Sequence, residues 1–145
     1  MSEKTTSKAT ACNFLALKQA TRSVSSLYER HIAKCGLTSP QFSIMRAIKH
    51  NPGIDMHDLA EIMVMDRTSL LRALKPLTRD GYVLQRASEV HPRKQVMCLT
   101  ADGEAKFGEA TEHWKAAQAE FEAEVGEEHA RTLREVLDGL VQRRF

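Results

Sequence analysis

The segment between Asp66 and Gly81 alternates apolar and polar positions with the period of an amphipathic helix. Its leucines recur at spacings of one, three and three residues, which places them in one helical stripe: Leu70, Leu71, Leu74 and Leu77. Asp66 is suited to cap the start of the helix, because its carboxylate can accept hydrogen bonds from free backbone N–H groups of the first turn. Gly81 is the residue type expected just past a helix end. The pattern predicts one helix with a buried leucine face.

The opposite face of this predicted helix carries hydrogen-bond donors and no carboxylate. Its members are Arg67, Thr68, Ser69, Arg72, Lys75 and Arg79. Side chains of these types suit DNA phosphates and base edges. The alternative is an ordinary solvated helix face, but such a face normally mixes charges of both signs. The composition therefore favours a DNA recognition helix.

Two short apolar runs follow the predicted recognition helix and flank a polar loop. Residues 82–86 and 95–99 predict the strands of a β-hairpin, and residues 87–94, which include Pro92, predict its long tip. The tip carries His91, Arg93 and Lys94. A flexible arm with arginine suits the narrow minor groove, whose negative potential attracts guanidinium groups. We expect Arg93 and Lys94 to contact DNA, although an incidental surface hairpin is the alternative.

Two more helices are predicted before the recognition helix. The nearer one is capped by Asp55 and places three apolar residues on one side: Leu59, Ile62 and Met63. The earlier one has Ser39 as its expected cap and Pro40 at its first position, and residues 51–53 end it. A helix pair followed by a basic hairpin is typical of a winged helix-turn-helix.

Residues 36–106 resemble the MarR family of winged-helix transcription regulators. The matching pieces, in the family's order and spacing, are Gly36-Leu-Thr-Ser-Pro-Gln-Phe42, Leu59-Ala-Glu61, Met65-Asp-Arg-Thr-Ser-Leu70, Leu77-Thr-Arg-Asp-Gly-Tyr-Val83 and Leu99-Thr-Ala-Asp-Gly103. The resemblance implies a homodimer that binds a pseudo-palindromic operator in double-stranded DNA, usually as a repressor. It also implies that a small ligand or an oxidant releases the operator.

The chain departs from the family pattern at two positions. The family commonly has an acidic residue two positions before the wing-tip arginine, whereas this chain has His91 before Arg93, and a histidine there can make wing contacts depend on pH. Pro76 lies inside the recognition helix, where it removes one backbone donor and predicts a kink near Arg72. One branch of the family carries a related proline, which indicates that the fold tolerates it.

The predicted helices at the two ends of the chain carry three apolar stripes. After a cap at Thr100 the first stripe is Phe107, Ala110, Trp114, Ala117 and Phe121. The second follows a break near Gly126 and comprises Ala130, Leu133, Leu137 and Leu140. The N-terminal helix supplies Phe14, Leu17, Val24, Leu27 and Tyr28. A winged helix alone could not cover these stripes, whereas a dimer with interleaved terminal helices could; a monomeric helical cap is the alternative.

These patterns predict a mainly α fold with a small β-wing: a winged helix-turn-helix core plus terminal helices that form an intertwined dimerisation domain. We expect residues 1–8 to be disordered and residues 9–145 to form a single MarR-type domain. Within it, residues 9–35 and 101–145 would supply the dimerisation helices and residues 36–100 the DNA-binding core.

Charge is distributed unevenly along the chain, although its net value is only +2. Residues 67–95 hold seven Lys or Arg against two acidic residues, whereas residues 101–128 hold nine acidic residues against two lysines. This polarity separates a surface that faces DNA from one that avoids it. No apolar run reaches the length of a membrane span, and residues 1–8 lack the apolar segment of a signal peptide, so we expect a cytoplasmic protein without a membrane partner.

The sequence contains no Gly-rich phosphate loop, nucleophile motif or zinc signature, so we expect neither an enzyme nor a cofactor or metal. His31 and Cys35 stand four residues apart, but no further ligand cluster accompanies them. Cys98 is expected to pack in a wing strand. Cys12 opens the first helix, where the helix dipole favours a thiolate, so a thiol-based redox sensor using Cys12 is an alternative function.

The family usually places its effector pocket between the dimer helices and the winged core. Here that wall would draw on Lys18, Arg22, Met45 and His50. Aromatic carboxylates or phenols would suit such cations, so a small aromatic or phenolic effector is expected. A protein-binding anti-repressor on the same fold is a further alternative, but it would not need a basic DNA-facing surface.

Overall fold

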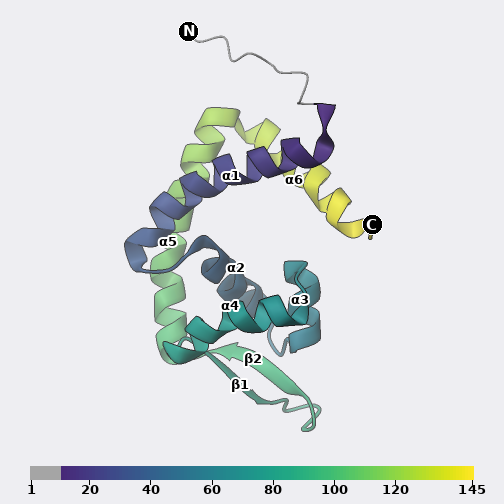
Figure 1. The fold of residues 1–145 in the computed structure, drawn as a ribbon. Coiled ribbons are helices and arrows are strands. Elements are labelled where there is room, and N and C mark those ends of the chain that lie inside the picture. Colours follow the sequence, from purple (N-terminus) through teal and green to yellow (C-terminus); the bar gives the residue numbers. More distant parts are fainter. Residues whose placement is uncertain (1–10) are drawn as a thin grey trace.

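The computed structural model describes residues 11–145, and the predicted disorder of residues 1–8 lies outside that range. Six α-helices and one hairpin follow in the order α1 (Asn13–Ile32), the short 3-10 helix η2 (Ala33–Cys35), α2 (Ser39–His50), α3 (Met56–Met63), α4 (Arg67–Arg79), β1 (Val83–Ala87), β2 (Gln95–Leu99), α5 (Ala101–Val125) and α6 (Glu127–Gln142). Helices α2 to α4 and the hairpin form one end of the molecule, and α1, α6 and the second half of α5 form the other (Figure 1). This arrangement confirms the predicted mainly helical fold with a two-stranded wing.

The hydrophobic core lies where α2, α3, α4 and the wing meet α5. Ile44, Met45, Leu59, Leu70 and Leu77 are at most 1% exposed. The rings of Phe42 in α2 and Phe107 in α5 stack with their centroids 5.4 Å apart, so this core extends onto the long helix. Helix α5 thereby joins the winged core to the arm formed with α1 and α6 (Figure 1).

Helix α4 begins and ends where the sequence predicts. Asp66 is its N-cap, and Gly81 adopts a left-handed φ of 78° just past its end. The Tyr82 N–H donates to the Leu77 carbonyl and the Gly81 N–H to the Thr78 carbonyl, which is the Schellman pattern that glycine favours. The helix continues through Pro76 and ends at Arg79.

The predicted leucine face of α4 needs one correction. Leu70, Leu74 and Leu77 are buried, but Leu71 is 47% exposed to solvent. At 100° per residue, Leu71 lies on the flank of the buried stripe rather than in its centre. The core of this helix is therefore narrower than the periodicity suggested.

Two other predicted positions also shift. Thr38, not Ser39, caps α2: the Thr38 hydroxyl accepts from the Gln41 N–H and the Gln41 side chain accepts from the Thr38 N–H. This reciprocal capping box requires Gln or Glu three residues after the cap. Gln41 stands at that distance from Thr38, whereas the residue at that distance from Ser39 is Phe42. In α3, Ile62 is 49% exposed, whereas Met56 in the first turn takes a place in the core at 7% exposure.

The terminal helices pack against each other within the chain and cover part of the predicted apolar stripes. Phe107, Ala110 and Ala117 of α5 are buried, and the Tyr28 ring of α1 lies 6.5 Å from that of Phe121. Gly126, with a φ of 86°, separates α5 from α6. Among residues 11–145 no helix has the length and apolar character needed to cross a membrane.

Candidate nucleic-acid interface

The start of α4 is held by the Asp66 carboxylate. It accepts from the Ser69 N–H at 2.8 Å and from the Ser69 hydroxyl at 2.7 Å. These two hydrogen bonds hold the pKa of the Asp66 carboxyl below its ordinary value, so the cap stays charged near neutral pH. Because the Ser69 hydroxyl donates to Asp66, it can offer only acceptor lone pairs to a partner while the cap is formed.

The predicted basic face is exposed along the whole of α4. Arg67, Thr68, Arg72, Lys75 and Arg79 are all exposed, and Ser69 is half-buried beside the cap. Arg79 forms an ion pair with the neighbouring Asp80 at 3.1 Å. Within residues 11–145 no acidic side chain pairs with the other three cations of this helix, which leaves them available to an anionic partner.

The wing is a regular antiparallel pair in which Val83 lies opposite Leu99 and Ala87 opposite Gln95. Ser88 orders its tip: its backbone N–H donates to the Lys94 carbonyl at 2.9 Å, and its hydroxyl accepts from the His91 N–H at 3.2 Å. His91 and Arg93 are exposed at this tip. Arg93 therefore stands on a hydrogen-bonded loop at the tip of the hairpin, and the hairpin lies at one end of the molecule (Figure 1).

Lys94 does not stand free beside Arg93. Its ammonium lies 3.7 Å from the Asp55 carboxylate, which caps α3 by accepting from the Asp58 N–H at 2.8 Å. The Asp58 bond foremost, and the Lys94 charge to a lesser degree, keep the pKa of the Asp55 carboxyl below its ordinary value. A backbone bond from the Met97 N–H to the Ile54 carbonyl, 2.8 Å long, joins the same two segments. Lys94 thus helps to fix the wing against α3.

A hollow of about 420 Å³ separates α4 from the wing. Its lining combines three buried apolar residues, Met56, Leu74 and Met97, with the exposed Leu71 and four exposed polar residues: Lys75, Thr78, Arg79 and Gln85. Thr78 and Gln85 were not among the sequence-predicted site residues. Thr78 stands three residues after Lys75, so the helical period alone could have placed it on the same face of α4. Gln85 of β1 reaches α4 only through the tertiary fold.

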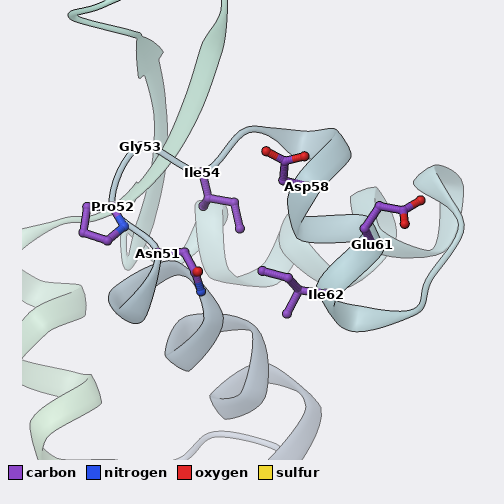
Figure 2. A pocket seen from close by; sticks show the side chains of 7 residues that line it. All are labelled: Asn51, Pro52, Gly53, Ile54, Asp58, Glu61 and Ile62. Carbon is purple, nitrogen blue, oxygen red and sulfur yellow. The ribbon is translucent and has the colours of Figure 1, made fainter. Parts of the chain in front are cut away.

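A second hollow, of about 460 Å³, lies on the other side of α3 between that helix and the turn after α2 (Figure 2). Asp58 and Glu61 project from α3 along its rim, and Asn51, Pro52 and Ile54 come from the turn (Figure 2). Two carboxylates repel phosphate, so this hollow does not belong to the basic surface.

The four predicted effector residues come from two helices. Lys18 and Arg22 are exposed on α1, Met45 is fully buried in α2, and His50 at the end of α2 sits edge-on to the Phe107 ring at 6.3 Å. None of the four lines either hollow described above. Sequence reasoning missed Arg46, whose guanidinium lies 4.6 Å from the centre of the Trp114 ring where α2 meets α5.

The cysteines occupy three different environments. Cys12 is exposed at the N-cap of α1, and its sulfur accepts from the Leu15 N–H at 3.5 Å. Cys35 is buried and donates to the Ile32 carbonyl, while Cys98 is half-buried in β2. His31 turns to Glu120, with 2.6 Å between nitrogen and oxygen, rather than toward Cys35.

Comparison with known proteins shows a matching family and a similar relative. A family model described as the MarR family matches residues 36–94. The chain is 30% identical over 127 residues to the homoprotocatechuate degradative operon repressor of Escherichia coli, covering 88% of this chain and 86% of that protein.

Two solved structures are also similar to it. The M. tuberculosis transcriptional regulator MosR in complex with DNA has a TM-score of 0.78 at 32% identity, covering 90% of this chain and 94% of that one. NadR in complex with 4-hydroxyphenylacetate has a TM-score of 0.75 at 25% identity, covering 90% and 92%.

Proposed function

The chain belongs to the MarR family of DNA-binding transcription regulators, which are not enzymes, and on this premise we propose that it is a homodimeric repressor released from a pseudo-palindromic operator by a small aromatic ligand. The observation that carries the proposal is a set of exposed cations on α4 and the wing tip that have no acidic partner within residues 11–145: Arg67, Arg72, Lys75 and Arg93. These side chains would neutralise phosphates and reach base edges. A protein-binding module on the same fold would have no use for them.

We assign α4 to the major groove and the wing tip to the adjacent minor groove. Thr68, Arg72 and Lys75 lie on the exposed side of α4 and would contact bases or phosphates there, and Arg93 would enter the minor groove. Arg79 and Lys94 have the weaker claim to DNA, because each already has a carboxylate partner. The M. tuberculosis relative with DNA supports the assignment by its overall likeness.

The terminal helices support a dimer because their outer faces are apolar. Phe14 and Leu17 of α1 are 69% and 45% exposed, and Leu133, Val136 and Leu137 of α6 are 43%, 58% and 37% exposed. Exposed large apolar side chains on both terminal helices are what an interface with another chain would cover. A second copy would cover it and would place two α4 helices about 34 to 36 Å apart, the spacing of successive major grooves.

The aromatic effector is supported by two relatives. One is a repressor of an operon that degrades homoprotocatechuate, and NadR was solved with 4-hydroxyphenylacetate; both compounds are phenolic carboxylates. In this chain, Lys18 and Arg22 would supply positive charge, and His50 would supply a hydrogen-bonding imidazole. Arg46, whose guanidinium lies against the Trp114 ring, adds a further cation at the junction of α2 and α5. Met45 would contribute only through the core, because it is fully buried.

Binding to a selected operator at several salt concentrations tests the DNA part. Four unpaired cations per protomer make eight per dimer, so affinity should fall about 10⁴-fold between about 50 and 200 mM salt. Arg72→Ala should make this dependence shallower, whereas Lys115→Ala, which removes a cation paired with Glu112 on α5, should leave it unchanged. A monomer in size-exclusion chromatography, or a DNA affinity that does not change with salt concentration, would contradict the proposal.

Release by ligand and release by oxidation need a direct comparison, because Cys12 is exposed at a helix N-terminus. We expect phenolic carboxylates to release the operator and to change the fluorescence of Trp114, the only tryptophan of the chain. Peroxide should have the same small effect on wild type and on Cys12→Ser. If peroxide releases only the wild type and no aromatic compound acts on either protein, the chain is a thiol-based sensor instead.

A further inference from the structure

Leu71 is an exposed aliphatic side chain on the basic side of α4. It is 47% exposed, whereas Leu70, its neighbour in sequence, is fully buried. Residues three and four apart on a helix are neighbours on its surface, so Leu71 lies beside Thr68 and Lys75. About half of this residue therefore stays open to solvent, and it lies among the donors assigned to DNA.

Leu71 borders a hollow that has an apolar floor and, among the residues that the structure describes, no carboxylate in its lining. Met56, Leu74 and Met97 form the buried floor of the hollow between α4 and the wing, and each is at most 7% exposed. Lys75 and Arg79 stand on its rim. An apolar patch with cations beside it is complementary to a polyanion that has an apolar group close to its charges.

Only one base offers such a group in the major groove. The edges of guanine, cytosine and adenine present hydrogen-bond donors and acceptors there, which an alkyl side chain would leave unpaired, whereas thymine presents its C5-methyl group. We propose that Leu71 packs against the methyl group of one thymine in each half-site and thereby selects that base. This inference rests on the proposed function, because it requires α4 to enter the major groove.

The size of the effect follows from the burial of one methyl group. Removing such a contact corresponds to a loss of affinity of about fourfold for one half-site. When both half-sites are changed, the dimer should lose about fifteenfold. Changes of this size are measurable by fluorescence anisotropy with labelled duplexes.

The experiment uses uracil, which differs from thymine only by the missing methyl group. An operator is first selected from a random duplex library with the full-length wild-type protein, and each thymine is then replaced by uracil in turn. Leu71→Ala and Ile62→Ala are measured on the same duplexes. Ile62 is the matched control, because it is an aliphatic residue with a similar exposure of 49% on α3 outside the basic face.

We expect wild type and Ile62→Ala to lose about fourfold at one thymine position per half-site. Leu71→Ala should bind the original operator more weakly and should no longer distinguish thymine from uracil at that position. Circular dichroism should show unchanged folding, because the replaced side chain is exposed.

Two results would overturn the inference while leaving the proposed function in place: wild type that tolerates every uracil, or Leu71→Ala that keeps the full sensitivity of wild type. If Leu71→Ala binds the thymine and uracil duplexes more weakly by the same factor, it has kept the sensitivity of wild type. Leu71 would then contact the sugar-phosphate backbone or act through packing. A wild-type protein that enriches no DNA would overturn both the proposed function and the inference.

Discussion

Replacing Gly103 with alanine should destabilise the protein, although alanine is the better helix former. Gly103 lies in the first turn of α5, where the Thr100 side chain caps the helix. A Cβ atom built on Gly103 would lie 2.0 Å from the carbonyl oxygen of Tyr82 and 2.9 Å from its carbonyl carbon. That oxygen also accepts a hydrogen bond from the Thr100 N–H at 3.0 Å. The obstacle is thus bonded backbone rather than a flexible side chain.

The magnitude can be worked from two opposing effects. Overpacking of this kind costs about 3 kcal/mol when the neighbour cannot move aside, and the exchange of glycine for alanine inside a helix gains about 1 kcal/mol. Gly103→Ala should therefore lower the free energy of unfolding by about 2 kcal/mol. Gly108 provides the control in the same helix, because a Cβ there meets nothing within 4 Å. Gly108→Ala should raise stability by about 1 kcal/mol.

Urea denaturation followed by circular dichroism and Trp114 fluorescence measures both variants. The protein concentration must be held constant, because unfolding of a dimer depends on it. Gly103→Ala should also weaken DNA binding more than Gly108→Ala, since Tyr82 connects the end of α4 to the wing. Equal shifts of the same sign in the two variants would refute the close approach of α5 to Tyr82.

Three further predictions concern the helix-turn-helix and the wing. Asp66→Ala should lower the urea midpoint at pH 7. Because Ser69 lowers the folded-state pKa of Asp66, the difference in midpoint between wild type and Asp66→Ala should shrink as the pH falls below about 4. A difference that stays constant down to about pH 2 would contradict this role of the charged cap. Val64 has a left-handed φ of 52° and is 67% exposed. Val64→Gly should therefore relieve backbone strain and raise the free energy of unfolding, measured by urea denaturation, by about 0.5 to 1 kcal/mol. A lower free energy of unfolding in Val64→Gly would show that the contacts of the valine side chain outweigh the strain. Arg72→Ala should cost about 1 to 3 kcal/mol and relax the preference at one base position in library selection, whereas Arg93→Ala should weaken all sequences alike; an unchanged preference in Arg72→Ala would move the base contact elsewhere on α4.

The sequence alone determined most of the helix boundaries, although it misplaced the cap of α2 by one residue. The caps at Asp55, Asp66 and Thr100 and the left-handed glycine at Gly81 are where the residue types place them. These signals are reliable because the unpaired backbone groups of a helix end are satisfied within about four residues along the chain. The hairpin was predictable for a similar reason, since two short apolar runs around a polar loop have few other ways to pair.

Only the tertiary structure decided which neighbouring residues are buried and which cations are free. Leu71 points about 100° away from Leu70 around α4, which puts it on the flank of the leucine stripe, but only the packing of distant segments decides that this flank stays 47% exposed while Leu70 is fully buried. In the same way, Lys94 meets Asp55 and Gly103 meets the Tyr82 carbonyl through the packing of separate elements. A helical period gives the direction of a side chain within its own helix, but exposure and charge pairing depend on what the rest of the chain places opposite it.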